Sequence, residues 1–423
     1  MKVENSKEGG ASDLQFAMVH VGARLHYAVP EVLAAAGMLK VMFTDAHAGL
    51  PLVRLTKLVP PTLRSPALRR LQARHIPKAI SPEHVRPWVY PTFQNEWFNR
   101  KYPDSSKLAS FAFEKNIGGH WLAKKAIAEN FGGANAFYAL PCICTEAVRE
   151  AKRRGLFVVY EAISHPFNMR TQKEEYQRLE LPLTEGMDCI EENIKYFAEE
   201  AALADVVLAA SEYVKRGLVE LGIAPERIAV VPYGLDADFI GEEPKPVPGR
   251  LLYVGTIDAH KGMAYYAEAA RALQAEGFKA EFRTIGPFSS PDVPSDPAFR
   301  GLDYVGQVPR AEVKREFARA DVFVFPTLTD GFGMVLLEAL FAGLPIISTP
   351  NCGDVVRDGF NGLVVPSHNA EALASAVREI VLNRALRDRM SENAFTLKKD
   401  FTLETYQDRL VLAIRDHAAR RKG

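Results

Sequence analysis

Two carboxylates and two glycines stand at chemically useful spacing in the segment DGFGMVLLE, residues 330–338. The helix that this segment opens is apolar on every side except for Glu338, and the next residues predict a helix end at Gly343 and then a buried strand. A helix that is apolar all round is a buried helix, and a carboxylate within it is destabilising unless a partner meets it. Glu338 therefore either lies at an exposed rim, with Asp330 capping the helix, or receives a ligand that offers hydroxyl groups.

The two glycines favour a ligand. Gly331 and Gly333 leave the helix N-terminus without side chains, so backbone N–H groups and the positive end of the helix dipole can face a phosphate. Asp330 precedes this anion site and Glu338 follows it by about two turns, at most ~12 Å away at the helical rise per residue. A nucleotide sugar carries a ribose on one side of its diphosphate and a hexose on the other, and two carboxylates that flank an anion site fit that shape.

The same segment resembles the motif E-G-F-G-x-x-x-x-E-A of the retaining family-4 (group 1) glycosyltransferases of the GT-B fold, with Asp330 in place of the first glutamate. VGTIDAHKG, residues 254–262, is similar to the family's V-G-R-x-x-x-x-K-G, with Thr256 in place of the arginine. IAVVPYGLDADF, residues 228–239, resembles V-I-P-N-G-V-D-x-x-x-F, with Tyr233 in place of the asparagine. The resemblance covers about residues 205–382 and extends loosely into the first half of the chain.

This resemblance implies a retaining hexosyltransferase that moves a sugar from a nucleotide-sugar donor, of UDP or GDP type, to an acceptor. The acceptor would be a sugar, a lipid-linked sugar or a small molecule, in polysaccharide, glycolipid or small-glycoside biosynthesis. No cofactor and no metal ion are expected, because Lys261 and the helix N-terminus would stabilise the charge of the leaving diphosphate. Catalytic roles are expected for Lys261, Asp330 and His165.

Donor contacts are expected from residues that follow strands or open the helix of the first motif. These are Gly22, Arg24, Gly255, Thr256, Gly286, Gln307, Val308, Gly331, Phe332, Gly333, Met334, Val335 and Glu338. Arg24 is the candidate for the cation that is missing at Thr256, since each charge-assisted hydrogen bond contributes roughly 1.5–3 kcal/mol. Structural interpretations stay open for three residues: a solvated lysine at Lys261, a buried structural histidine at His165 and an ordinary β–α turn at Gly22. His26 is a second candidate for the cleft.

The chain reads as an α/β protein with two Rossmann-like parallel-sheet domains that face a cleft (GT-B). At 423 residues it exceeds what one hydrophobic core usually holds, and both halves alternate apolar strands with amphipathic helices. The predicted divisions are a disordered tail at 1–12, an acceptor-side domain at 13–235, a proline-rich linker at 236–249, a nucleotide-sugar-binding domain at 250–400 and a helix at 401–423 that crosses back to the first domain. In open α/β sheets, ligands bind beyond the carboxyl ends of the strands.

Several classes of protein are disfavoured. Lys plus Arg equals Asp plus Glu, 52 each, which argues against a nucleic-acid binder. No G-x-G-x-x-G run follows a strand, which argues against an NAD-dependent dehydrogenase. The four cysteines have no C-x-x-C spacing, and we expect reduced thiols in a cytoplasmic protein. The alternatives that stay open are a GT-B sugar-nucleotide epimerase, a phosphorylase and a non-catalytic nucleotide-sugar binding protein.

Residues 51–81 carry seven cations and no acid, with leucines and valines between them, and Pro60, Pro61, Pro66 and Pro77 divide the stretch. A basic segment with interleaved apolar residues is typical of a surface for anionic lipid. The alternative is a solvated loop or a lid over an anionic acceptor. We expect reversible attachment to the inner face of the cell membrane through this stretch.

Overall fold

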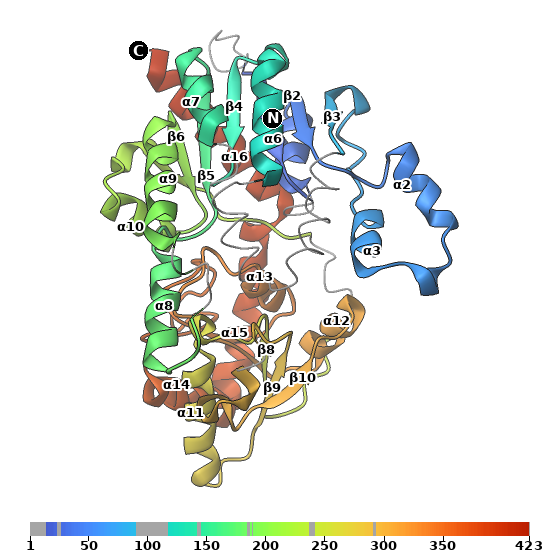
Figure 1. Cartoon of the computed structure of the whole chain (residues 1–423). Helices are drawn as coiled ribbons and strands as arrows, with labels where there is room; N and C mark the ends of the chain where they lie inside the picture. The colour runs from blue at the N-terminus through green and yellow to red at the C-terminus, as the bar shows by residue number, and fades with distance from the viewer. Residues whose placement is uncertain are drawn as a thin grey trace, which may run out of the picture.

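The structure, a computed structural model, describes residues 14–22, 27–89, 117–141, 145–183, 187, 189–236, 242–290 and 293–422. It consists of two α/β domains that lie one above the other in Figure 1, each built on one parallel sheet. This is the two-domain architecture predicted from the sequence. Arg24 and His26 lie outside the described residues.

The first domain contains a seven-stranded parallel sheet in the order β3-β2-β1-β4-β5-β6-β7. Its strands are β1 (Phe16–His20), β2 (Leu39–Thr44), β3 (Val85–Pro87), β4 (Ala136–Ala139), β5 (Phe157–Ala162), β6 (Val206–Ala209) and β7 (Ile228–Val230). Its helices are α1 (Ala28–Ala35), α2 (Pro51–Leu55), α3 (Pro66–Gln72), α6 (Ile117–Ala128), α7 (Thr145–Arg153), α8 (Asn168–Arg178), α9 (Ile190–Leu203) and α10 (Glu212–Glu220). Every residue of β1 and of β5 is buried, so both faces of the sheet are covered, as parallel sheets require.

The second domain contains a six-stranded parallel sheet in the order β10-β9-β8-β11-β12-β13. Its strands are β8 (Arg250–Val254), β9 (Glu281–Ile285), β10 (Asp303–Gly306), β11 (Val322–Phe325), β12 (Ile346–Ser348) and β13 (Gly362–Val364). Its helices are α11 (Met263–Ala275), α12 (Arg310–Arg319), α13 (Met334–Phe341), α14 (Ala370–Leu382) and α15 (Arg384–Leu397).

In each sheet the strand order reverses at one point. This switch point lies between β1 and β4 in the first sheet and between β8 and β11 in the second. The connections on the two sides of such a point diverge to opposite faces of the sheet, which opens a crevice at the carboxyl ends of the strands. The residues that follow these four strands are therefore placed to line a ligand site.

Helix α13 begins at Met334, four residues later than the start of the DGFG segment. Gly333 occupies the N-cap position with a left-handed backbone, φ 75°, and no side chain caps the helix. The helix buries Leu336, Leu337, Ala339, Leu340 and Phe341, and it ends before Gly343, which is also left-handed. The buried apolar helix and its glycine stop are confirmed, whereas Asp330 is not the capping residue.

The two domains touch along α8 and α10. Ser211, the N-cap of α10, donates to the backbone carbonyl of Gly331 at 2.7 Å, and the Tyr213 hydroxyl donates to Thr329 at 3.0 Å. Tyr176 of α8 donates to the buried carboxylate of Asp258 at 2.8 Å. These buried hydrogen bonds hold the second domain against the first.

The last helix, α16 (Leu403–Lys422), lies against the first domain. Leu235 pairs with Thr402 in a parallel bridge just before α16 begins, and the rings of Tyr406 and Tyr233 meet at 5.7 Å. At the far end Arg421 forms an ion pair with Asp205 at 3.3 Å. Within the part of the chain that the structure describes, no helix combines the length and apolarity that crossing a bilayer requires.

Candidate active site between the domains

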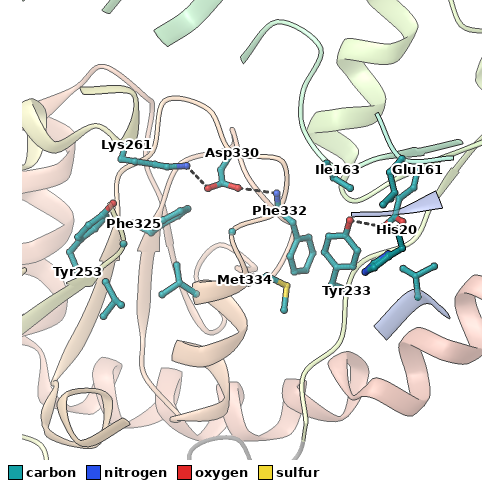
Figure 2. Close-up of a pocket in the computed structure, with 16 residues that line it drawn as sticks. His20, Glu161, Ile163, Tyr233, Tyr253, Lys261, Phe325, Asp330, Phe332 and Met334 are labelled. Atoms are coloured by element: carbon teal, nitrogen blue, oxygen red, sulfur yellow. Dashed lines mark hydrogen bonds and ion pairs between the residues drawn. The ribbon is translucent and has the colours of Figure 1, made fainter. Parts of the chain in front are cut away.

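A cavity of about 390 Å³, here named the interdomain cavity, lies where the carboxyl ends of the two sheets face each other (Figure 2). From the first sheet it is lined by His20 at the end of β1, Leu140 after β4 and Glu161 of β5. From the second sheet it is lined by Gly255 after β8 and Phe325 at the end of β11. The cavity thus sits at the switch point of both sheets, where ligands of this fold class bind.

Lys261 and Asp330 form one wall of the interdomain cavity and contact each other. The Lys261 ammonium lies 2.6 Å from Asp330 Oδ2, and the second carboxylate oxygen accepts from the Phe332 N–H at 3.2 Å (Figure 2). Lys261 is held in a short helical turn that Asp258 caps through the His260 N–H. An ammonium carries three N–H donors, and Asp330 occupies one of them, so this cation can also bind an anion in the cavity.

The N-terminus of α13 forms the adjacent wall. Phe332, Gly333, Met334 and Val335 all line the interdomain cavity. No side chain caps the helix, and its first residues line the cavity, so the positive end of the helix dipole lies at the cavity wall. The residues of the predicted anion site therefore line one cavity together with Lys261.

Gly331 has a different role from the one expected. A Cβ added at Gly331 would lie 1.9 Å from the carbonyl oxygen of Ile163 in the first domain. Its missing side chain permits the close approach of the two domains, and Gly331 is not among the residues that line the cavity.

Glu338 lines a second cavity of about 870 Å³, here named the α12–α13 cavity. Burial raises the pKa of Glu338 to about 7, and the charges of Arg310 and Lys314 on α12 oppose part of that rise. Met334 and Tyr233 line both cavities, so the two are neighbours along α13. The lone carboxylate of the buried helix therefore lines a cavity near two cations of another helix, and its exposure is intermediate, so it is not fully exposed at a rim.

On the first-domain side, a buried carboxylate faces the interdomain cavity. Glu161 accepts hydrogen bonds from the hydroxyls of Tyr138 at 2.8 Å and Tyr233 at 2.7 Å (Figure 2 shows Tyr233). His20, buried at the end of β1, lines the same cavity and packs its ring against Tyr27 at 5.0 Å. Sequence reasoning missed Glu161 and His20, although each is a polar residue at the end of an apolar strand.

His165 does not line either cavity. It follows β5 by three residues, and its ring stacks on Tyr213 at 4.2 Å while Nδ1 accepts from the Phe167 N–H at 3.3 Å. Burial, with a smaller effect from Arg216, lowers its pKa to about 4, so the ring is neutral near pH 7. The chain has turned away from the cavity by this point, and the structure favours the structural interpretation of His165.

Five other predicted donor residues, Gly22, Thr256, Gly286, Gln307 and Val308, line neither cavity. Gly286 follows β9, and a Cβ there would lie 1.9 Å from the Gly255 carbonyl oxygen, so the missing side chain allows two strand ends to approach. Thr256 is exposed, and its carbonyl accepts from Tyr253 at 2.8 Å. Gln307 and Val308 come directly after β10. Gly22 follows β1, and its N–H donates to Asp45 at 3.0 Å.

Among the described residues, no group of three or more His, Cys, Asp or Glu side chains is arranged to hold a metal ion.

Comparison with known proteins identifies the second half of the chain. Residues 248–383, which contain Lys261, Asp330 and Glu338, match the family model described as glycosyl transferases group 1. The chain therefore carries a group 1 glycosyl transferase domain. This glycosyl transferase domain contains both carboxylates and the helix N-terminus that the sequence singled out.

Relatives of the glycosyl transferase domain carry matching names. The alpha-D-kanosaminyltransferase of Streptomyces kanamyceticus is 31% identical over 172 residues, which are 39% of this chain and 42% of that protein. The amylovoran biosynthesis glycosyltransferase AmsK of Erwinia amylovora is 27% identical over 203 residues, 44% of this chain and 50% of that protein. The chain thus spans about half the length of the curated relatives it matches.

Solved structures extend the likeness of fold to nearly the whole chain. The sucrose-phosphate synthase of Thermosynechococcus elongatus superposes with a TM-score of 0.60 at 18% identity, over 96% of this chain and 100% of that one. Anabaena Alr3699/HepE, in complex with UDP, superposes with a TM-score of 0.58 at 12% identity, over 95% of this chain and 100% of that one. The two parallel-sheet domains therefore form the GT-B fold.

Proposed function

We propose that this protein transfers a sugar from a nucleotide-sugar donor to an acceptor hydroxyl in polysaccharide, glycolipid or small-glycoside biosynthesis. One observation carries the proposal: the bare N-terminus of α13 lies between the Lys261–Asp330 pair and Glu338, at the switch points of two facing sheets. An anion site with a carboxylate on each side matches a diphosphate between two polyhydroxyl groups.

The donor lies along α13 in this proposal. The diphosphate meets the first N–H groups of the helix and the Lys261 ammonium, which stabilise the negative charge that grows as the sugar–phosphate bond breaks. Glu338 accepts hydrogen bonds from the ribose hydroxyls in the α12–α13 cavity. Asp330, held by Lys261 and by the Phe332 N–H, orients the hydroxyls of the transferred sugar.

The acceptor enters from the first domain. Glu161 is fixed by two tyrosine hydroxyls in the wall of the interdomain cavity, and it would accept a hydrogen bond from an acceptor or sugar hydroxyl. Apolar walls from Leu140, Ile163 and Phe332 keep water away from the reacting groups. His165 has no direct role in this arrangement.

We further propose retention of the anomeric configuration, a UDP-type donor and a reaction without a metal ion. The match of DGFGMVLLE to the retaining family's motif supports retention. Structural neighbours of the same fold include Anabaena Alr3699/HepE in complex with UDP-glucose, which supports the nucleotide. Lys261 and the α13 N-terminus supply positive charge at the diphosphate, which supports independence from metal.

The test is incubation of the protein with UDP-, GDP- and ADP-sugars, with and without a panel of sugar and lipid-linked acceptors. We expect nucleoside diphosphate release that depends on acceptor and a glycoside whose anomeric proton shows the donor's configuration by NMR. A chelator should leave the rate unchanged, and a loss restored by magnesium would contradict the metal-free proposal. Isomerised free nucleotide sugar would indicate an epimerase, phosphate-dependent release of a sugar phosphate would indicate a phosphorylase, and binding without turnover would indicate a binding protein.

A further inference from the structure

A projecting arm follows β2 and carries helices α2 and α3; it comprises residues 47–80 and extends away from both domains in Figure 1. Its base is closed by a backbone hydrogen bond from the Ala48 N–H to the Arg74 carbonyl at 2.9 Å and by the Arg74–Asp45 ion pair at 2.7 Å. Val53 and Ile80 are its buried anchors. The arm is therefore attached firmly at its base while its two short helices reach into solvent.

Four large apolar side chains of the arm are exposed. The exposed fractions are 65% for Leu52, 61% for Leu55, 82% for Leu58 and 74% for Leu63. Single exposed leucines are common on protein surfaces, but a cluster within one short segment marks an interaction surface.

The charged residues of the arm all have the same sign, but they do not all face outward. Arg64 donates to the carbonyls of Lys57 and Val59 at 2.8 Å each, and Arg74 pairs with Asp45, so these two stabilise the arm itself. The exposed cations are Arg54, Lys57, Arg69, Arg70 and Lys78, of which Arg69 also donates to the Arg64 carbonyl at 3.2 Å. Because the whole chain has no net charge, the arm concentrates positive charge locally.

We propose that the arm binds the surface of an anionic lipid bilayer, with the leucines among the acyl chains near the headgroups and the cations on the lipid phosphates. A bilayer offers both partners at once, whereas a nucleic acid or an acidic polysaccharide offers anions and no apolar medium for the leucines. Helix α2 has 5 residues and α3 has 7, so the arm lies in the interface and does not cross the bilayer.

The base of the arm is connected to the loop that borders the interdomain cavity. Asp45 accepts from Arg74 through Oδ2 and from the Gly22 N–H through Oδ1, and Gly22 follows His20, which lines the cavity. A bilayer bound by the arm therefore lies on the side of the first domain where the carboxyl ends of β1 and β2 emerge. Lipid binding itself does not depend on the proposed transferase activity.

Vesicle co-sedimentation tests the proposal, with vesicles of phosphatidylcholine alone and of phosphatidylcholine with phosphatidylglycerol. We expect binding that requires phosphatidylglycerol and weakens with salt. Arg70→Gln with Lys78→Gln should weaken binding by about fivefold for each cation lost, and Leu52→Ser with Leu55→Ser and Leu58→Ser should abolish it. Arg74 stays unchanged in these variants, because its loss would disturb the base of the arm.

Matched controls come from α14 and α16. Leu382→Ser with Leu412→Ser removes leucines that are 70% and 60% exposed outside the arm, and Arg415→Gln with Arg420→Gln removes two exposed cations. Neither control should change vesicle binding. Leu58→Trp adds a direct readout, since its fluorescence should shift to the blue on anionic vesicles and be quenched by brominated lipid.

Three results would overturn the proposal. The first is the absence of pelleting with anionic vesicles, and the second is equal pelleting with neutral ones. The third is equal loss of binding in the control variants. Self-association that the leucine variants abolish, without vesicle binding, would show instead that the arm binds a second copy of the chain.

Discussion

Glu338 is the residue whose environment says most about the site. It sits on an otherwise apolar helix, and burial raises its pKa to about 7 in the free protein. In the proposed complex, a ribose with two hydroxyl donors would favour the ionised form of this carboxyl group and lower its pKa again. The proposal therefore predicts that ligand binding releases a proton at this position.

Glu338→Gln should remove a pH dependence of stability. Because the folded-state pKa is raised, the folded protein holds this proton more tightly than the unfolded chain does. The contribution to stability is therefore greatest below the unfolded pKa of 4.5 and is lost as pH rises through about 7. Between about pH 5 and about pH 8, the difference in free energy of unfolding between variant and wild type should change by up to ~3 kcal/mol in the variant's favour. If denaturant unfolding gave parallel pH profiles of stability for the variant and the wild type, the pKa of Glu338 would not be raised in the folded protein.

Lys261→Ala should reduce turnover more than donor affinity. Negative charge on the diphosphate grows toward the transition state, so loss of this cation should lower kcat by roughly 10²–10³-fold while the donor Kd rises less. Lys279→Ala, at an exposed lysine of the same domain, is the matched control and should leave kcat unchanged. An unaltered kcat in Lys261→Ala, measured on folded protein, would remove Lys261 from the mechanism.

Glu161→Gln should affect the acceptor and spare the donor. The amide keeps the shape of the carboxylate, but only its oxygen can accept a hydrogen bond, so Tyr138 and Tyr233 can no longer both donate to separate oxygens. The group that faces the cavity therefore loses its charge and its fixed orientation. We expect a higher acceptor KM and a lower kcat, with donor Kd measured by titration close to wild type. A fall in thermal stability with normal kinetics at low temperature would assign Glu161 a structural role.

At the scale of elements, the loops after parallel strands decide where the two domains meet. The loop between β11 and α13 places Asp330 and Gly333 in the interdomain cavity and Gly331 against the Ile163 carbonyl of the first domain. One short loop therefore carries both residues of the candidate site and a contact between the domains. A change in domain contact should consequently be felt in catalysis.

Gly331→Ala tests that coupling. The added Cβ would fall 1.9 Å from a backbone oxygen, so the domains must separate or the loop must shift, at a cost of about 1–3 kcal/mol in stability. We expect a drop in kcat larger than that of Ser211→Ala, which removes the neighbouring 2.7 Å hydrogen bond and leaves the spacing intact. Calorimetric unfolding measures the stability of both variants, and initial rates measure their kcat. Wild-type stability and kcat in Gly331→Ala would contradict the close contact.

Much of this element scale could be predicted from local patterns. The alternation of apolar strands and amphipathic helices predicted both sheets, and the glycine and periodicity signals around α13 predicted its bare N-terminus, its buried faces and its end at Gly343. The position of Arg310 and Lys314 around the same cavity as Glu338 depends on where α12 lies relative to α13, which no local pattern encodes. His165 was misplaced because the direction of a side chain beyond a strand's end depends on the turn that follows. Glu161 and His20 could be predicted only with knowledge of the strand order. Many strands end in a polar residue, but few of these ends meet at a switch point.

At the scale of the whole molecule, the arrangement of the two domains forms the cavity and also places the positive arm near it. Two sheets with facing carboxyl ends enclose a cavity that the two domains line jointly, and buried hydrogen bonds along α8 and α10 fix the domains beside it. The helix α16 ends on the first domain, so the chain passes between the domains twice. The positive arm extends from the same first domain, near the loop after β1.

The central claim is that the α13 region binds a nucleoside diphosphate between Lys261 and Glu338. Isothermal titration of the wild type, Lys261→Ala and Glu338→Gln with UDP, GDP and ADP tests it most directly. We predict one site per chain for at least one of these nucleotides, with affinity lower by about tenfold to a hundredfold in Glu338→Gln, since a charge-assisted hydrogen bond is lost. Absence of binding by all three nucleotides, or equal affinity in the wild type and both variants, would contradict the account.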